Sequence, residues 1–435
     1  MQNLCPGSAS LRRPWPNSFQ PALSWYDGTV KNTPCLRSTL TGIEYPFERL
    51  EEFAENGESL EVAIPGIENA RPRPGSRIWD RFAEFMPFEG NHPGLSLGEG
   101  STPLVDAGPL LKAYTGLENL LFKNETANPT WSFKDRGSIA CSIMAVERGE
   151  RVTATISTGN MGQSMAAYGA RAGLEVIVFL PAFTPREKVL SMAVHGATVV
   201  RVACADYADM KMRVLGLASS LGLRIVSGNG PIRVEGYKME AFELFEALGS
   251  EAPDFIVVPT SACGHVRGIF KGFRELRAAG FITRLPRMVI AQAAANSPVA
   301  SAIKKKSREI VPFRNFTTIA EALSSGRPPG GEEILDKALE FGWLAEDATE
   351  EEILESQALY ARSGFFVEPG TATTLPALRK LAASGAIQPQ TRVVVMLTGS
   401  GMKDIEVLGR QEMKIVDCSS ESLEATVGGL IEPSA

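Results

Sequence analysis

The feature that most constrains the fold is a regular alternation of short β-branched runs with longer amphipathic runs, from about residue 151 onward. Short runs rich in Val and Ile are typical of buried strands, and the longer runs have helical spacing. This succession predicts an α/β fold with parallel strands and helices on both faces of the sheet. The predicted strands are 151–157, 174–181, 197–203, 223–228, 254–261, 287–293 and 392–401. The predicted helices between them are 159–173, 185–196, 206–222, 235–249 and 266–280.

Composition is that of an ordinary globular protein, and it excludes several functions. Of the 435 residues, 44% are hydrophobic and 22% are charged, which is ample material for a core. The net charge of −6 argues against nucleic acid as the main partner. No apolar run reaches the roughly 18 residues that span a bilayer, and the first residues lack the apolar stretch of a secretion signal. We therefore expect a cytoplasmic protein that does not contact membranes.

Cysteine and histidine spacing predicts no metal site. The six cysteines form no Cys-x-x-Cys pair, and the three histidines, His92, His195 and His265, are far apart in the sequence. No Gly-x-Ser-x-Gly elbow marks a serine hydrolase either. The chemistry of the chain must therefore be sought in other residues.

Small and hydroxylated residues follow three of the predicted strands. These segments are 158–162 (TGNMG), 260–265 (TSACGH) and 398–401 (TGSG). The carboxyl ends of parallel strands meet at one edge of a sheet, where ligands collect. Free amides at a helix start, with small side chains beside them, form an anion site. Each segment taken alone is also compatible with an ordinary turn, since turns favour the same residues.

A lysine in an unusual setting adds to these segments. Lys134 lies in NPTWSFKDRGS (128–138), between an Asn-Pro turn and a helical run. A lysine, an anion cradle and a hydroxyl at a third strand end are the parts that a pyridoxal phosphate enzyme needs. The lysine forms a Schiff base with the cofactor aldehyde, the cradle holds the phosphate, and the polar side chain faces the ring nitrogen. The sequence thus predicts pyridoxal 5'-phosphate as cofactor.

Six stretches, in the family's own order, carry a resemblance to the threonine synthase family, within the tryptophan-synthase-like (fold type II) pyridoxal phosphate enzymes. The match covers roughly residues 75 to 404. Its motifs are LGEGSTPLV (97–105), NPTWSFKDRG (128–137), STGNMGQSMAAYGARAG (157–173), PIRVEGYK (231–238), GFFVEPGTATTLPAL (364–378) and TGSGMKD (398–404).

The resemblance implies a role for each site residue. Lys134 forms the Schiff base and acts as catalytic base and acid, Asn160 faces the cofactor 3-hydroxyl, and Thr398 is the partner of the pyridine nitrogen. The cofactor phosphate would be held by the loop Thr260, Ser261, Ala262, Cys263, Gly264 and His265. The substrate would be held by Ser157, Thr158, Met161 and Arg233. The residues alone leave simpler interpretations open: Asn160 as a helix cap, Thr398 as a satisfied core hydroxyl, Arg233 as an ion-pair partner of Glu235 or another acid, and Cys263 and His265 as loop residues without chemistry.

The sequence departs from the family pattern in the substrate half of the site. Trp131 stands where the family has Gly, three residues before the lysine. The phosphate loop reads Ser-Ala-Cys-Gly-His in place of Gly-Asn-x-Gly-Asn. Ser227 and Gly228 take the place of an Asn-Ser pair that grips the phosphate of O-phosphohomoserine in the family. The cofactor half therefore matches the family and the substrate half is altered.

Three functions remain open after these observations. The first is threonine synthase activity: γ-elimination of phosphate from O-phospho-L-homoserine and β-hydration to L-threonine. The second is a related β-elimination or β-replacement on another anionic amino acid such as O-phosphoserine, catalysed by a sister synthase or ammonia-lyase. The third is a non-catalytic protein that binds the cofactor, which the intact Lys134, Asn160 and Thr398 argue against.

The expected domain organisation follows the same resemblance. We expect an N-terminal extension (1–95) that wraps the body and contains one helix near 75–86, and a large cofactor-binding domain (96–140 and 227–410). A small mobile α/β domain (141–226) and a C-terminal tail (411–435) with an added strand and helix complete the chain. A homodimer is expected from the resemblance.

Overall fold

The computed structural model describes residues 33–49, 51–90, 92–204, 207–314, 316–411 and 413–431. The part of the predicted N-terminal extension before residue 33 and the last four residues of the tail lie outside the described residues. The strands are β1(Cys35–Ser38), β2(Glu44–Tyr45), β3(Leu60–Ala63), β4(Leu104–Asp106), β5(Leu120–Asn124), β6(Val152–Ile156), β7(Glu175–Pro181), β8(Thr198–Val202), β9(Ile225–Val226), β10(Phe255–Pro259), β11(Arg287–Ala293), β12(Leu344–Ala348) and β13(Val393–Leu397).

The helices follow the strands in the predicted succession. The α-helices are α1(Ile78–Arg81), α2(Gly108–Thr115), α3(Lys134–Glu147), α4(Asn160–Ala172), α5(Arg186–Ala193), α6(Tyr207–Leu221), α7(Pro231–Tyr237), α8(Met239–Ala247), α9(Gly264–Ala278), α10(Pro298–Lys304), α11(Gly331–Phe341), α12(Glu350–Arg362), α13(Pro369–Ala372), α14(Thr374–Ala383) and α15(Leu423–Ile431). Short 3-10 helices are η1(Ile67–Asn69), η2(Ala83–Phe85), η3(Pro93–Leu95), η4(Glu125–Ala127), η5(Glu321–Leu323), η6(Gly401–Lys403) and η7(Ile405–Arg410). None of these helices has the length and hydropathy that a membrane-crossing segment requires.

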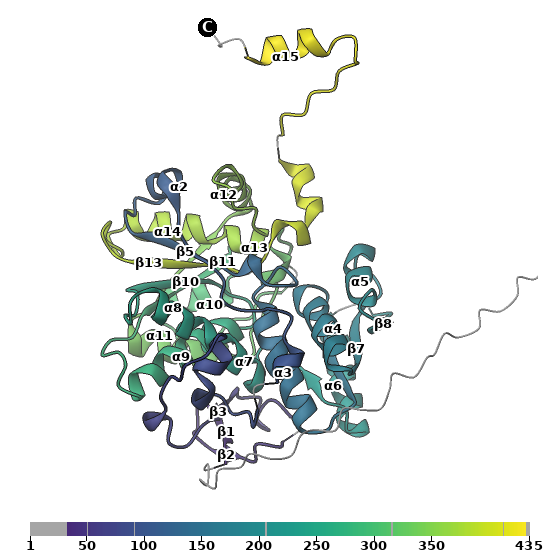
Figure 1. Cartoon of the computed structure of the whole chain (residues 1–435), viewed down its shortest axis with the longest axis vertical. Helices are drawn as coiled ribbons and strands as arrows, with labels where there is room; N and C mark the ends of the chain where they lie inside the picture. The colour runs from purple at the N-terminus through teal and green to yellow at the C-terminus, as the bar shows by residue number, and fades with distance from the viewer. Residues whose placement is uncertain are drawn as a thin grey trace, which may run out of the picture. The chain divides into compact units, whose positions relative to one another are not determined.

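A six-stranded sheet, in the order β12-β11-β10-β13-β5-β4, is the larger of the two parallel layers. Its strands are parallel except for β4, which pairs antiparallel with β5 at one edge. Alternate residues of β10 enter two different cores: Ile256 and Val258 pack in one, and Phe255 and Val257 in the other. Helices therefore cover both faces, as Figure 1 shows for α2, α12 and α14 above the sheet and α8, α9 and α11 below it. The predicted fold class is confirmed.

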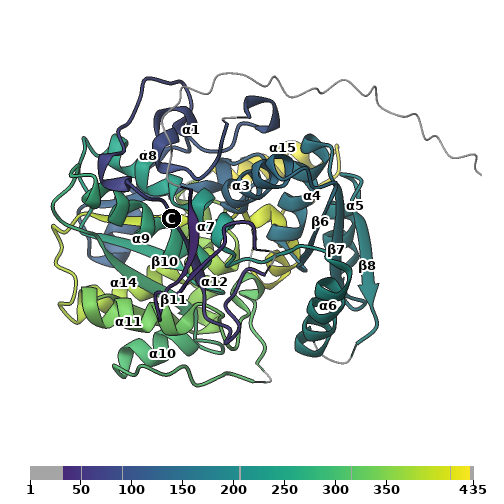
Figure 2. The same cartoon turned by 90° about the horizontal axis from the view of Figure 1, so that it is seen from below.

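A four-stranded parallel sheet, in the order β8-β7-β6-β9, is formed by residues 152–226. Val176, Val178 and Leu180 of β7 pack in a core with residues of α4 and α5. On the opposite face, Ile156 packs against Met210 and Val214 of α6. Figure 2 shows β6, β7 and β8 together with α4, α5 and α6. The interpretation of 141–226 as a small mobile domain stays a prediction.

The N-terminal segment contains a structure that the sequence pattern did not predict. Strands β1, β2 and β3 form a small antiparallel sheet in the order β2-β1-β3. Strands of two to four residues with polar positions between apolar ones give too little periodicity to detect. The helix predicted near 75–86 is present as α1 followed by η2.

The predicted tail is partly wrong. A helix is present, α15, but the described residues between 411 and 431 contain no strand. The side chains of the segment before α15 are mostly exposed, and many of them are polar. A strand needs pairing partners as well as β-branched residues. This segment has few β-branched residues, and no described strand pairs with it.

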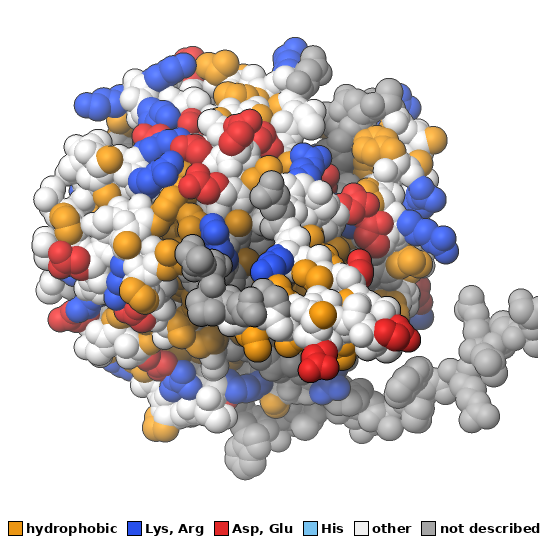
Figure 3. Space-filling view, turned by 90° about the horizontal axis from the view of Figure 1, so that it is seen from above, with side chains coloured by type: hydrophobic (Ala, Val, Ile, Leu, Met, Phe, Trp, Pro, Cys, Tyr) orange, Lys and Arg blue, Asp and Glu red, His pale blue; other side chains and the backbone are white. Residues whose placement is uncertain are grey.

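The fold brings three loops to one edge of the large sheet. Strands β10, β13 and β5 are neighbours and run parallel. Their carboxyl ends lead into 260–264, 398–401 and, through η4, into 128–134. The fourth polar segment, 158–162, follows β6 in the smaller sheet. On the face shown in Figure 3, acidic and basic side chains are interspersed, and no extended basic area is visible there.

Candidate active site

Lys134 is the first residue of α3, and its position is fixed by the segment that follows β13. The amide of Phe133 donates to the carbonyl of Thr398 at 3.0 Å, and the amide of Ser400 donates to the carbonyl of Trp131 at 3.0 Å. These two bonds bind the residues before α3 to the end of a central strand. The lysine is thereby held on rigid elements, as a reactive group requires.

The Lys134 amine lies in an apolar and weakly charged environment. Its Nζ is 4.2 Å from the centre of the Phe133 ring and 5.8 Å from that of Tyr237. Burial, assisted by the nearby Arg233 cation, lowers the pKa of Lys134 to about 7, although Glu368 opposes this. A substantial fraction of the amine is therefore neutral near pH 7. A neutral amine is the nucleophilic form that condenses with an aldehyde.

Glu368 joins the two residues that the sequence assigns to the cofactor ring. Its Oε2 accepts a hydrogen bond from Nδ2 of Asn160 at 2.8 Å, and its Oε1 accepts one from Oγ1 of Thr398 at 3.1 Å. A Cβ at Gly399 would lie 2.6 Å from Cδ of this carboxylate, so a larger residue there would displace the Glu368 side chain. One carboxylate thus bridges Asn160 and Thr398. The sequence analysis did not identify Glu368, although it lies within the quoted motif 364–378.

The predicted phosphate loop is compact and leads into α9. The hydroxyl of Thr260 donates to the carbonyl of Val258 at 2.8 Å, and its amide donates to the carbonyl of Ala291 at 2.9 Å, so both donors of Thr260 are bound within the sheet. Cys263 caps α9 in the left-handed region, with φ at 69°. A Cβ at Gly264 would lie 2.3 Å from the carbonyl oxygen of Gly228, so the helix start packs directly on the loop before α7. The loops that are expected to bind the two phosphates are therefore in contact.

His265, the second residue of α9, stacks beneath the residue before the lysine. Its ring centre is 3.8 Å from that of Phe133, with an interplanar angle of 18°. Its Nε2 is 2.7 Å from Oε2 of Glu240. The interpretation of His265 as a loop residue without chemistry leaves this buried pair unexplained.

One buried polar atom near Lys134, Nδ1 of His265, has no hydrogen-bond partner among the described residues. The hydroxyl of Tyr237 and the guanidinium of Arg233 interact with each other beside the lysine. A buried polar atom without a partner is rare in folded proteins and usually indicates a missing ligand or water. Burial raises the pKa of Tyr237 to about 12, against the effect of Arg233, so its hydroxyl is a donor at neutral pH. A phosphorylated aldehyde such as pyridoxal phosphate fits this combination of a neutral amine and a buried nitrogen without a partner.

The four residues assigned to the substrate are differently placed. Ser157 accepts hydrogen bonds from the amides of Gly159 and Gly162, at 3.3 and 3.0 Å, and so stabilises the first turn of α4. Thr158, just before α4, and Met161, the second residue of α4, are half-buried. Their role in binding the substrate stays a prediction.

Arg233 is fully buried between α3 and α7. It donates to the carbonyl of Ser227 at 3.0 Å, to the carbonyl of Lys134 at 3.4 Å and to the hydroxyl of Ser138 at 3.3 Å. The alternative pairing with Glu235 is wrong, because that carboxylate binds Lys238 and Lys271 instead. Its guanidinium also interacts with the hydroxyl of Tyr237.

A second lysine near the site, Lys403, was also missed by the sequence analysis. Nζ of Lys403 donates to the carbonyl of Thr130 and to Oε1 of Gln163, both at 2.6 Å. It therefore links the turn before Lys134 to α4 of the smaller sheet. Burial lowers the pKa of Lys403 to about 8. The indication in the sequence was the position of Lys403 in the motif TGSGMKD (398–404), in which the sequence analysis gave the lysine no role.

Trp131 has a backbone conformation that explains the glycine of the family motif. Its φ is 64°, which strains a side chain this large, and 52% of the residue is exposed. We expect Trp131→Gly to be more stable than Trp131→Ala by about 1 kcal/mol, because both remove the indole and only glycine removes the strain. Urea unfolding of the two variants measures this difference. At most sites the alanine variant is more stable than the glycine variant. A higher free energy of unfolding for Trp131→Ala than for Trp131→Gly would therefore contradict the expectation.

Comparisons with known proteins agree with this geometry. A family model described as "Pyridoxal-phosphate dependent enzyme" matches residues 95–399. The chain is 37% identical to the threonine synthase of Methanocaldococcus jannaschii over 351 residues, which are 80% of this chain and 86% of that protein. It is 35% identical to the threonine synthase of Methanosarcina acetivorans, over 81% of this chain and 87% of that protein.

Solved structures share the fold at low sequence identity. A fungal L-serine ammonia-lyase from Rhizomucor miehei superposes with a TM-score of 0.61 at 18% identity, covering 72% of this chain and 97% of that one. A serine racemase from maize gives a TM-score of 0.60 at 18% identity, covering 76% of this chain and 92% of that one. These likenesses support the architecture and, at such identities, nothing finer.

Proposed function

The chain belongs to the pyridoxal-phosphate dependent enzyme family, and from this premise we propose that it converts O-phospho-L-homoserine and water to L-threonine and phosphate. It is a threonine synthase-like lyase that uses pyridoxal phosphate. The observation that carries the proposal is the placement of the Lys134 amine beside the buried guanidinium of Arg233 and the ring of Tyr237. The positive charge of Arg233 would attract the phosphate of a substrate.

The residues of the chain supply binding, orientation and proton transfer. When bound, pyridoxal phosphate supplies an aldehyde that condenses with an amine and a ring that stores an electron pair. Asn160 and Thr398 would orient the ring, with Glu368 holding both side chains in place. Lys134 Nζ would remove the α proton of the substrate and return protons later, which requires a neutral amine. The amides at the start of α9 would bind the cofactor phosphate.

The proposal is tested by incubating the purified, cofactor-loaded protein with O-phospho-L-homoserine. We expect phosphate and threonine to appear in equal amounts. A protein with bound cofactor that releases neither product would contradict the proposal.

A β-substituted anionic substrate such as O-phosphoserine is the second candidate. The amide of Ser227, at the position of the family's phosphate-gripping pair, already donates to Oε2 of Glu52 at 2.7 Å. This contact favours a substrate whose phosphate lies elsewhere and nearer the lysine. A parallel assay with β-substituted and γ-substituted phosphoamino acids separates the candidates. Turnover of γ-substituted substrates alone would eliminate this one.

The pH dependence of cofactor capture provides a separate prediction. The pKa of Lys134 lies at about 7 instead of its ordinary 10.5, so the amine becomes neutral as pH rises through about 7. We expect the rate at which the cofactor-free protein captures pyridoxal phosphate to rise roughly tenfold between about pH 6 and 8 and then level off. Borohydride trapping at timed intervals measures the rate, with Nα-acetyllysine as control. A rate that keeps rising to about pH 10 in the protein, as it does for the free lysine, would show an ordinary amine.

Linkage gives the same group a second consequence. The folded pKa of Lys134 lies below the unfolded one, so the unfolded chain binds more protons between about pH 7 and 10.5. The contribution of Lys134 to the stability of the cofactor-free protein therefore increases with pH through this window.

We further propose a cytoplasmic location, which the composition of the sequence supports, and a homodimer, which the resemblance supports. The division into a large cofactor-binding domain (96–140 and 227–410) and a small mobile domain (141–226) belongs with them. The two separate parallel sheets support this division. Binding of the substrate between mobile and fixed parts would exclude water from the reaction.

A further inference from the structure

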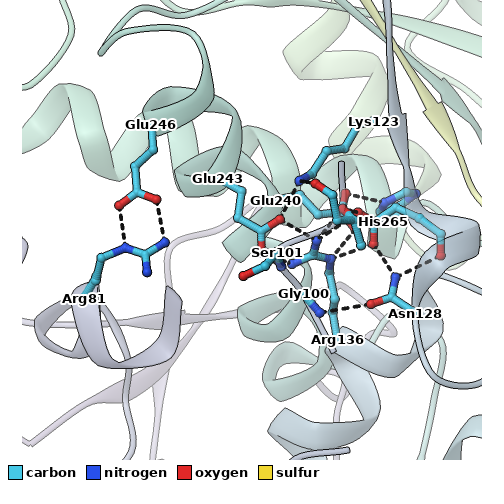
Figure 4. Close-up of polar contacts among 12 residues, drawn as sticks. Arg81, Gly100, Ser101, Lys123, Asn128, Arg136, Glu240, Glu243, Glu246 and His265 are labelled. Atoms are coloured by element: carbon cyan, nitrogen blue, oxygen red, sulfur yellow. Dashed lines mark hydrogen bonds and ion pairs between the residues drawn. The ribbon is translucent and has the colours of Figure 1, made fainter. Parts of the chain in front are cut away.

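Glu240 and His265 form a buried pair directly behind the catalytic lysine. Glu240 lies on α8 and is fully buried, and His265 on α9 is 6% exposed. Their contact joins Oε2 and Nε2 at 2.7 Å, as Figure 4 shows. On its other side the imidazole stacks on Phe133, the residue before Lys134. The pair therefore links the core beneath the site to the wall of the site.

The surroundings of the pair keep both members uncharged. Burial, together with the carboxylate of Glu125, raises the pKa of Glu240 far above its ordinary value, although Arg136 and Lys123 oppose this shift. Burial and the positive charges of Lys134 and Arg136 hold the pKa of His265 well below its ordinary value. The other carboxyl oxygen of Glu240, Oε1, faces Nε of Arg136 at 3.5 Å and has no acceptor within hydrogen-bond reach among the described residues. The proton of the neutral acid is therefore on Oε2, which donates it to Nε2 of the neutral imidazole. The ring proton must then be on Nδ1.

We propose that Glu240 is a positioning residue that fixes the proton of His265 on Nδ1, so that this nitrogen donates a neutral hydrogen bond to a phosphoryl oxygen bound beside Lys134. Nδ1 is buried and has no partner among the described residues. The inference rests on the proposed function only where the phosphoryl group belongs to the substrate. It holds for the cofactor phosphate whatever the substrate is.

Stereochemistry explains how histidine can stand where the family motif has asparagine. Nδ1 of histidine and Nδ2 of asparagine are both two bonds from Cβ. An imidazole with its proton on Nδ1 therefore presents a donor at the same distance from the backbone as the asparagine amide. Only the imidazole has a second nitrogen that requires a partner, and the carboxyl group of Glu240 is that partner. The acid and the histidine form one unit in this chain.

The tautomer can be measured directly, because the chain has three histidines. Nitrogen-15 NMR of the cofactor-free protein, assigned with His92→Gln and His195→Gln, reports which ring nitrogen carries the proton. We expect the Nδ1–H form for His265 in the wild type and in Glu240→Gln, whose amide still donates to Nε2. Glu240→Leu should lose this preference and show a mixture. An Nε2–H form or a charged ring in the wild type would overturn the proposal.

Binding measurements identify the phosphoryl group. We expect His265→Phe, which keeps the stack on Phe133, to bind one phosphoryl ligand about tenfold more weakly or worse. His265→Asn should restore the affinity to within about threefold of the wild type. If the ligand is the cofactor, Kd rises for pyridoxal phosphate and is unchanged for pyridoxal. If it is the substrate, cofactor Kd is unchanged and KM for O-phospho-L-homoserine rises. Unchanged values for both ligands in a folded His265→Phe would overturn the proposal, even if the proposed function holds.

Discussion

Replacing Lys134 by alanine is expected to lower turnover by at least about 10³-fold and to abolish covalent attachment of the cofactor. Removal of a general acid–base group alone lowers rates by about 10²–10⁴-fold. Here the same amine is also the nucleophile, and its lowered pKa makes it reactive near neutrality. Reduction with borohydride followed by peptide mass analysis should find pyridoxyl mass on the peptide containing Lys134 in the wild type and nowhere in the variant. Alanine favours helix, so α3 should form normally.

Two outcomes would contradict this assignment. One is a Lys134→Ala protein that retains more than a few per cent of turnover. The other is a cofactor adduct on Lys403, a half-buried lysine near the site whose pKa is also lowered. Lys112→Ala is the matched control, since that lysine pairs with Asp106 near the surface and away from the site. It should leave both turnover and the adduct unchanged.

The sheet architecture was predictable from sequence because its strands are buried on both faces. A strand such as β10 sends alternate residues into two apolar cores, so its sequence is a continuous apolar run that needs no alternation to be detected. The small sheet β1–β3 gave no such signal. Its strands are short, and half of their positions are polar or exposed. The strand predicted in the tail failed for a related reason, since residue preference cannot show whether a pairing edge exists.

Site residues could be predicted where their role is indicated by neighbouring residues in the sequence. They could not be predicted where the role depends on tertiary contacts. Lys134 stood out because of its turn-to-helix setting. Glu368 did not, because its role comes from contacts with Asn160 and Thr398, which are 208 and 30 residues away. The contact between Glu240 and His265 joins two helices, and no repeating pattern in the sequence indicates it. The strain at Trp131 is visible only in its backbone angle, although the family's glycine was an indirect sign of it.

A buried ion network lies beneath the site and orders the elements that carry it. Glu243 on α8 accepts hydrogen bonds from Nη1 and Nη2 of Arg136, both at 2.8 Å, from Nζ of Lys123, and from the amide of Ser101 at 2.8 Å. Glu125 binds the remaining face of Arg136. Figure 4 shows Arg136 among these groups. Burial alone would raise the pKa of Glu243, but Arg136 and Lys123 lower it to about 2. One carboxylate thus joins α3, β5 and α8.

Glu243→Gln is expected to lower the free energy of unfolding by about 3–5 kcal/mol, because it leaves two buried cations with one carboxylate. Glu246→Gln, on the same helix, is the matched control: it breaks the exposed pair with Arg81 and should cost no more than about 1 kcal/mol. Urea unfolding monitored by tryptophan fluorescence compares the two variants. If Glu243→Gln is too unstable to purify, the double variant Glu243→Gln with Lys123→Met should recover part of the loss, since it removes one unpaired cation. Equal stabilities for Glu243→Gln and Glu246→Gln would mean that water or rearranged side chains compensate the buried charges, and that the network does not hold α3 in place.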